Sequence, residues 1–106
     1  MPSKNYDLKF SPIAEEDLDE IYNYISTKLF AEKAAKKLME KIEARIMRLA
    51  DLPFSCNFVT NELLKNRGYR KLIVDNYIVF YRVNEVKKQV VIMPILYGAS
   101  NYENIL

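Results

Sequence analysis

The stretch that decides the fold is Tyr69–Val83, which reads Tyr-Arg-Lys-Leu-Ile-Val-Asp-Asn-Tyr-Ile-Val-Phe-Tyr-Arg-Val. Two runs rich in Val, Ile, Tyr and Phe flank Asp75 and Asn76, two residue types that tolerate positive φ better than most. This pattern predicts a β-hairpin with a two-residue turn at Asp75 and Asn76.

The predicted turn fixes which side chains share a face of the hairpin, because side chains alternate along a strand. One face, which we expect to pack on helices, carries Arg70, Leu72, Val74, Tyr77, Val79, Tyr81 and Val83. The opposite face carries Tyr69, Lys71, Ile73, Ile78, Phe80 and Arg82. We expect this second face to be an open surface with an apolar centre and basic edges, and therefore the place to look for function.

The amino-acid composition of the chain is typical of a globular protein. The 106 residues suffice for a single core, so we treat residues 1–106 as one domain. Net charge is −1 over residues 1–52 and +3 over residues 53–106, which permits a polyanionic partner without requiring one. The chain has no histidine, so we expect no metal site and no cofactor. One cysteine and no bilayer-length apolar run lead us to expect a cytoplasmic protein that contacts no membrane.

The remaining segments supply a helical layer and two more strands. Residues 4–10 alternate and predict a first strand. Ser11 and Pro12 are a typical N-cap and first helical residue, and the helix that they open is expected to end near residues 28–30. Its expected buried stripe is Leu18, Ile21, Tyr22, Ile25 and Leu29.

A second helix is expected from residue 31 to residue 52, where Pro53 ends it, and residues 53–68 read as a long loop with a helical turn near 62–65. Residues 90–97 read as an interior final strand with a bulge at Pro94. The predicted order is β-α-α-β-β-β, a two-layer α+β fold with a helical hairpin packed on a mainly antiparallel sheet.

Three features together resemble the RelE/ParE family of toxins from bacterial type II toxin–antitoxin modules. They are the Ser-Pro pair before an acidic helix, the central hairpin with Tyr77 and Tyr81, and the ending Ile-Leu-Tyr-Gly-Ala-Ser-Asn-Tyr-Glu-Asn-Ile-Leu over residues 95–106, with its Gly98, Tyr102 and Glu103. The resemblance implies a small cytoplasmic growth inhibitor that is held inactive in a hetero-oligomer with a cognate antitoxin. It leads us to expect no direct sequence-specific DNA binding.

We place the antitoxin on the second face of the hairpin and on the helical hairpin. The residues that we expect to bind it on the sheet are Tyr69, Ile73, Ile78 and Phe80. An apolar surface of this kind suits a protein partner.

The resemblance leaves the target to be decided between the ribosome and DNA gyrase. RelE-like members cleave mRNA in the ribosome with a metal-independent cluster of Lys, Arg and Tyr. Lys71 falls at one of their basic positions, whereas Tyr69 and Ile78 stand where a lysine and an arginine are expected. Ala99 and Ser100 likewise stand where an arginine is expected. An mRNA endonuclease would have to use Lys71, Arg82 and Tyr102 as its catalytic residues.

ParE-like members inhibit DNA gyrase and need no such cluster. Their ending commonly reads His-Gly-Arg-Arg-Asp-Tyr, whereas residues 97–102 here read Tyr-Gly-Ala-Ser-Asn-Tyr. We favour the ParE-like function, because a central apolar patch is a poor environment for the charged transition state of RNA cleavage. The alternatives are a RelE-like ribosome-dependent mRNA endonuclease and a non-toxic protein-interaction module with the same fold.

Overall fold

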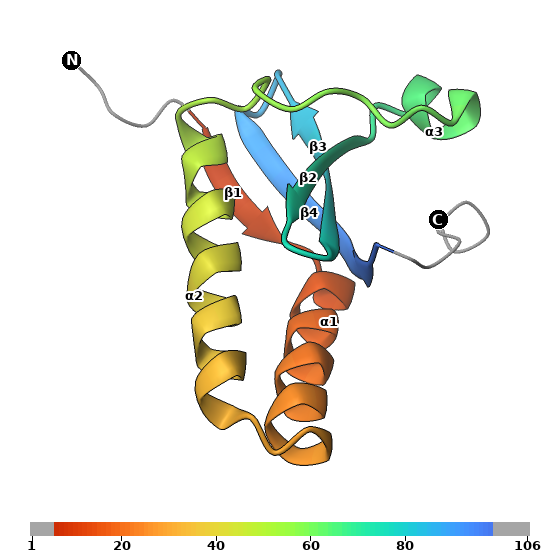
Figure 1. The fold of residues 1–106 in the computed structure, drawn as a ribbon. Helices are drawn as coiled ribbons and strands as arrows, with labels where there is room; N and C mark the ends of the chain where they lie inside the picture. The colour runs from red at the N-terminus through yellow and green to blue at the C-terminus, as the bar shows by residue number, and fades with distance from the viewer. Residues whose placement is uncertain (1–5, 99–106) are drawn as a thin grey trace.

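The computed structural model describes residues 6–98 and has the two-layer α+β architecture predicted (Figure 1). The elements in chain order are β1 (Asp7–Phe10), α1 (Pro12–Asn23), α2 (Glu32–Met47), α3 (Glu62–Asn66), β2 (Arg70–Val74), β3 (Tyr77–Asn84) and β4 (Gln89–Tyr97). A π-helical turn, Tyr24–Lys28, prolongs α1, and a 3-10 turn, Arg48–Ala50, prolongs α2. The sheet order is β1-β4-β3-β2, with β1 parallel to β4 and the other pairs antiparallel.

The central hairpin has the predicted register. Arg70 pairs with Tyr81, Leu72 with Val79 and Val74 with Tyr77. Asp75 adopts a φ of 54°, as the two-residue turn requires. The main core lies on the predicted face and joins β2, β3 and β4 to both helices; among its buried members are Leu72, Val74, Val79, Tyr81, Ile42 and Ile46.

Local signals along the chain also behave as expected. Ser11 caps α1, since its Oγ accepts a hydrogen bond from the N–H of Ala14 at 3.2 Å. The register between β3 and β4 shifts between Val79 and Tyr81, opposite Pro94, which confirms the predicted bulge. In the described part of the chain, no helix has the length and apolar character needed to cross a membrane.

The second face of the hairpin points away from α1 and α2, as predicted, but it is not open. Tyr69, Ile78 and Phe80 are buried in a second core together with Val59 and Leu64. The prediction of an exposed surface is therefore wrong for these three residues. On this face Ile73 is 53% exposed.

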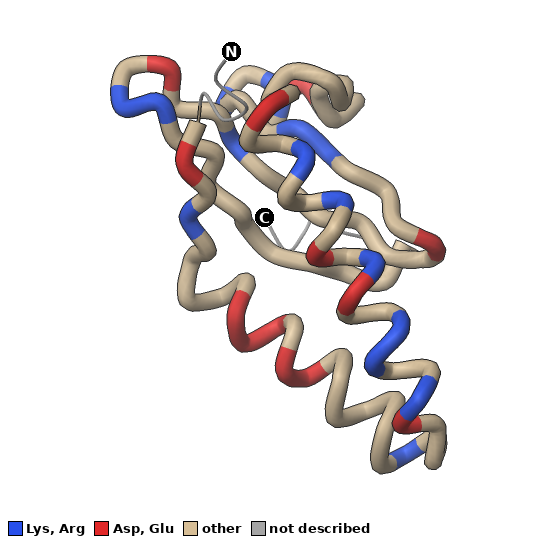
Figure 2. Tube along the Cα trace, turned by 90° about the vertical axis from the view of Figure 1, so that its left-hand side faces the viewer, with Lys and Arg blue, Asp and Glu red and all other residues tan. Residues whose placement is uncertain are grey.

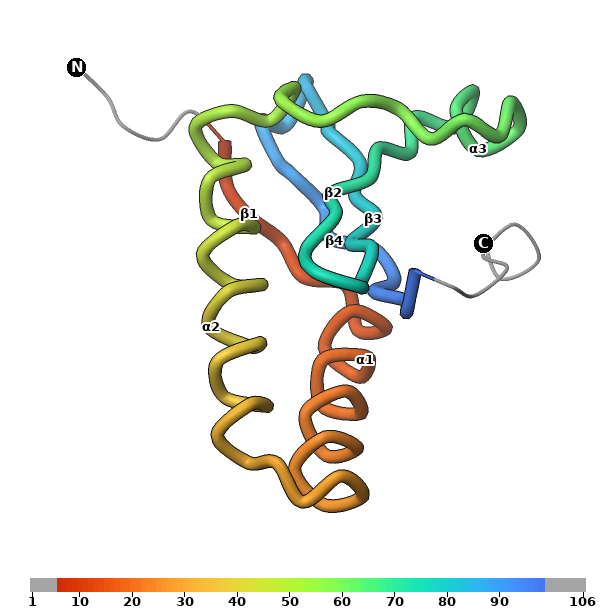
Figure 3. The backbone as a smooth tube through the Cα atoms, in the orientation of Figure 1, coloured from red at the N-terminus to blue at the C-terminus, as the bar shows by residue number. Residues whose placement is uncertain are grey.

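The cover for this face is the segment between α2 and β2, which runs across the top of the sheet (Figure 3). Asn61 caps α3, because its Oδ1 accepts a hydrogen bond from the N–H of Leu64 at 3.0 Å. The short helix holds Leu64 in the second core. The helical turn near residues 62–65 is thus confirmed, and burial of the face follows from it.

Residues 53–58 of the same segment are hydrogen-bonded to the helix-facing side of the β2–β3 hairpin. The hydroxyl of Tyr81 donates to the carbonyl of Pro53 at 3.1 Å, and Nη1 of Arg70 donates to the carbonyl of Cys56 at 2.7 Å. The Arg70 guanidinium also lies 4.0 Å from the ring centre of Phe58. The segment therefore wraps around the edge of β2 and contributes to both cores.

The second core generates a stability prediction. Phe80→Ala should lower the free energy of unfolding by about 3–5 kcal/mol, because it removes a fully buried aromatic ring and leaves a cavity. Ile73→Ala, on the same face but exposed, should cost less than about 1 kcal/mol. Urea denaturation of both variants measures the difference, and equal losses would contradict the burial of this face.

The Tyr81 hydroxyl generates a pH prediction. Burial, and next a hydrogen bond with Cys56, raise the pKa of Tyr81 above its ordinary value. The folded state therefore holds the phenolic proton more tightly, and stability should fall once the unfolded chain begins to ionise above pH about 10. Tyr81→Phe should cost about 1 kcal/mol at neutral pH and should make this alkaline decline shallower. Denaturation series at pH 7 to 11 test it; an unchanged slope would contradict the assignment.

Candidate functional site

The helices α1 and α2 continue beyond the end of the sheet (Figure 1). A groove lies between this extension and the sheet. Its volume is about 870 Å³. It is lined by α1, the π-helical turn, the start of α2 and the ends of β3 and β4, through Asp17, Glu20, Ile21, Tyr24, Ile25, Leu29, Ala31, Ala34, Tyr77, Ile95, Leu96 and Tyr97. We call this surface the hairpin groove.

The groove exists because the apolar stripe of the first helix is longer than the sheet that it covers. Leu18 and Ile21 pack on the main core. Further along the stripe, Tyr22 and Ile25 are half-buried and Leu29 is 55% exposed. Leu18, Ile21, Tyr22 and Ile25 are all half-buried, so the prediction of a buried stripe is wrong for Leu29, where the helical hairpin extends past the strands.

Asp17 joins the wall of the groove to the sheet. Strand β1 ends at Phe10, opposite Ile92, so β4 has no neighbouring strand on this side beyond Ile92. Pro94, which lies in this unpaired stretch, has no N–H to donate. Oδ2 of Asp17 accepts a hydrogen bond from the N–H of Ile95 at 2.9 Å. In the sequence, Asp17 is one of several acidic residues near the start of a helix, and no signal links it to a residue 78 positions away.

Two tyrosines form the end of the groove nearest the turn between β2 and β3. The rings of Tyr77 and Tyr97 meet edge to face, with centroids 5.6 Å apart. Burial, followed by the proximity of Tyr97 and Tyr24, raises the pKa of Tyr77, so its phenol is neutral at physiological pH. The lining thus combines apolar surface, tyrosine rings and the side chains of Asp17 and Glu20, a set that suits the binding of a largely apolar segment.

The residues proposed for RNA cleavage lie elsewhere. Lys71 pairs with Phe80 across β2 and β3, and Arg82 follows on the same face, with its guanidinium 5.6 Å from the ring centre of Tyr69. The structure therefore brings Lys71 and Arg82 onto one face of the sheet, opposite the helical layer. Tyr102, like Ala99 and Ser100, lies outside the described residues.

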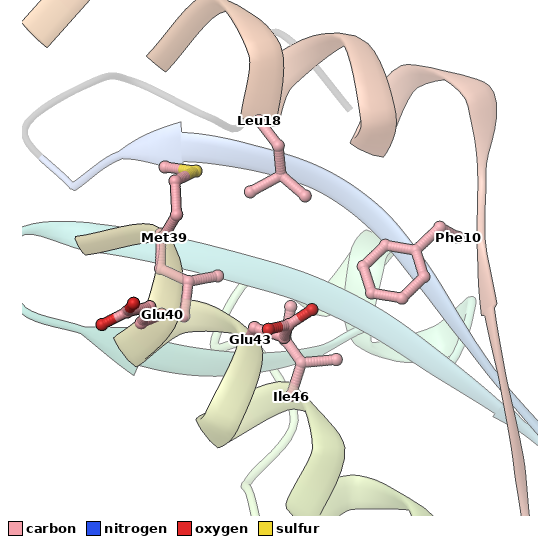
Figure 4. Close-up of a pocket in the computed structure, with 7 residues that line it drawn as sticks. Phe10, Leu18, Met39, Glu40, Glu43 and Ile46 are labelled. Atoms are coloured by element: carbon pink, nitrogen blue, oxygen red, sulfur yellow. The ribbon is translucent and has the colours of Figure 1, made fainter. Parts of the chain in front are cut away.

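A smaller pocket of about 240 Å³ lies between the two helices on the side of β1. Figure 4 shows Phe10, Leu18, Met39 and Ile46 around it, with the carboxylates of two glutamates at its margin. The helices also differ in charge: the charged residues of α1 are all acidic, whereas α2 carries both signs with basic residues in excess (Figure 2). The helical hairpin is thus electrostatically asymmetric.

Comparisons with known proteins agree with this architecture. A family model described as the ParE toxin of type II toxin–antitoxin system, parDE, matches residues 8–102. No curated protein sequence matches the chain.

Solved structures of toxin–antitoxin proteins share the fold. A chain from the chromosomal ParDE system of P. aeruginosa superimposes with a TM-score of 0.72 at 23% identity, covering 88% of this chain and 96% of that one. E. coli toxin RelE, a mutant in the free state, gives 0.65 at 14% identity, with 96% and 99% covered. A chain of the RelBE2 complex from Mycobacterium tuberculosis gives 0.59 at 18% identity, with 93% and 98% covered.

The family match spans nearly the whole chain. The helical hairpin, the sheet order and the sequence of the β2–β3 hairpin are consistent with this match. The chain belongs to the family of ParE toxins of type II toxin–antitoxin systems.

Proposed function

We propose that this protein is a growth inhibitor that acts in the cytoplasm on DNA gyrase and that a cognate antitoxin neutralises by filling the hairpin groove. The observation that carries the proposal is a large apolar concavity on a chain of the ParE family. Exposed apolar patches of this kind on a single soluble chain are typical of protein-interaction sites.

The shape and chemistry of the hairpin groove favour a peptide segment as its occupant. A groove between two helices and a sheet end accepts the apolar side of a helix or an extended chain. Tyr24, Leu29 and Tyr97 supply exposed apolar surface, while Glu20 supplies negative charge. We therefore expect an antitoxin segment with apolar anchors and neighbouring Lys or Arg residues.

The antitoxin site predicted on the sheet changes accordingly. Tyr69, Ile78 and Phe80 are covered by the chain's own α3 segment, so a partner reaches them only by displacing it. Ile73 is exposed and borders a small hollow that it shares with Tyr77 and Tyr97. We place the antitoxin along the hairpin groove, past the two tyrosines and on to Ile73.

The two candidate targets, DNA gyrase and mRNA in the ribosome, require different side chains on the surface of the toxin. Inhibition of gyrase requires a binding surface, which this chain offers. Cleavage of mRNA requires a proton acceptor, a proton donor and cations around the phosphate. This second candidate is supported by one observation, the presence of Lys71 and Arg82 on one face, and it would add Tyr102 as a catalytic residue.

Induced expression separates these functions. Expression should arrest growth, and co-expression of the antitoxin from the adjacent reading frame should restore it. The purified protein should inhibit supercoiling by DNA gyrase or trap cleaved DNA. Full gyrase activity with an excess of toxin would exclude the gyrase target, and new mRNA 5′ ends inside ribosome-bound codons would establish the endonuclease instead. Normal growth would support the non-toxic module.

A bulky substitution in the hairpin groove tests whether the antitoxin binds there. Ala34 is an exposed α2 residue that lines the groove, so Ala34→Arg should weaken antitoxin binding at least tenfold, which is about 1.4 kcal/mol. Ala44→Arg is the matched control, because Ala44 is also exposed on α2 but lies outside the groove. Titration calorimetry measures both. Equal affinities of the two variants would place the antitoxin elsewhere.

A further inference from the structure

Phe30, in the connection between α1 and α2, has an unusual combination of conformation and exposure. Its φ is 50°, in the left-handed region, and its side chain is 91% exposed. Bulky residues rarely adopt this conformation, because the Cβ atom crowds the neighbouring backbone. A large apolar side chain therefore stands in water on a strained backbone.

The turn explains the backbone but not the side chain. The N–H of Leu29 donates to the carbonyl of Tyr24 at 3.2 Å, and the N–H of Ala31 donates to the carbonyl of Ile25 at 3.1 Å. Helix ends closed in this way place one residue in the left-handed region, usually Gly or Asn. Phe30 gains little burial in return, so folding gives no reason for phenylalanine here.

The charges around Phe30 indicate the chemistry of a partner. Lys28 and Lys33 flank it and are both exposed. Glu32 lies 4.0 Å from Lys36, so this nearby acid already faces a lysine of its own helix. We call Lys28, Phe30 and Lys33 the hairpin tip. It is an apolar knob with positive neighbours, which complements an apolar pocket with an acidic rim.

Shape distinguishes the tip from the hairpin groove. The groove is concave, so a short antitoxin segment can fill it. The tip belongs to the connection at the far end of the helical hairpin from the β3–β4 turn (Figure 1), and the Phe30 side chain there is exposed. A side chain as exposed as that of Phe30 is buried most completely in a pocket of a folded partner.

We infer that Phe30 is the anchor that inserts into an acid-rimmed apolar pocket of the toxin's folded target, on a surface separate from the antitoxin groove. The inference rests on the proposed function, because it takes growth arrest as the activity to be explained. It does not depend on which protein is the target.

The test replaces Phe30 with a residue that suits the turn. Phe30→Asn should raise Tm by roughly 4 °C, because Asn tolerates the left-handed conformation. It should leave antitoxin affinity within threefold and reduce growth inhibition at least tenfold. The matched control is Val86→Asn, since Val86 is 94% exposed and lies in the β3–β4 turn. This control should retain full growth inhibition.

A charge variant gives a second readout. Lys33→Glu should weaken growth inhibition at least threefold, whereas Lys87→Glu, an exposed lysine in the β3–β4 turn, should not.

The outcomes separate the two proposals. Full growth inhibition by Phe30→Asn overturns the inference, and so does a parallel loss of antitoxin affinity, which would assign the tip to the antitoxin. If the wild-type protein arrests growth without affecting gyrase, the gyrase target fails while the comparison of Phe30→Asn with Val86→Asn still decides the role of the tip. If the wild-type protein does not arrest growth, both proposals fail.

Discussion

The reversal at Asp75 and Asn76 sets the register of β2 on β3, and the rest of the molecule is built on that register. Because side chains alternate along a strand, a slip of one residue would exchange the faces of the hairpin. Here both faces carry buried residues, Tyr81 beneath the helical layer and Phe80 beneath the α3 segment. Gly98 adds to the closure, since its N–H donates to the carbonyl of Asn76 at 2.6 Å and a Cβ at that position would come within 3.0 Å of the same oxygen.

The sequence predicts the features that depend on neighbours along the chain. The hairpin register, the Ser11 cap and the bulge at Pro94 follow from turn chemistry, capping chemistry and the missing N–H of proline, and the structure has all three. The burial of Phe80 was not predictable in this way. It depends on Val59 and Leu64, which lie in a segment without periodicity and act only through contacts made after folding. The hairpin groove was hidden for a related reason, because an apolar helix stripe reads the same whether or not a sheet covers it.

Burial also accounts for two departures from the RelE pattern. Tyr69 and Ile78 occupy positions where cations are expected, and both lie in the second core. A lysine or arginine there would lose its hydration, which is costly without a buried partner. In this chain, packing has replaced charge at these two positions, so the face retains Lys71 and Arg82 at its margins rather than a continuous cationic cluster. We propose that recognition instead uses the groove and the tip of the helical hairpin.

The hydrogen bond from Ile95 to Asp17 has a consequence for how a partner is received. It ties α1 directly to β4 at the groove wall in the free protein. In the complex proposed above, this bond would help to pre-form the toxin side, so that the entropy lost on association falls mainly on the incoming segment. Under that proposal, a change in the antitoxin that favours the docked conformation of its free segment strengthens binding without adding a contact.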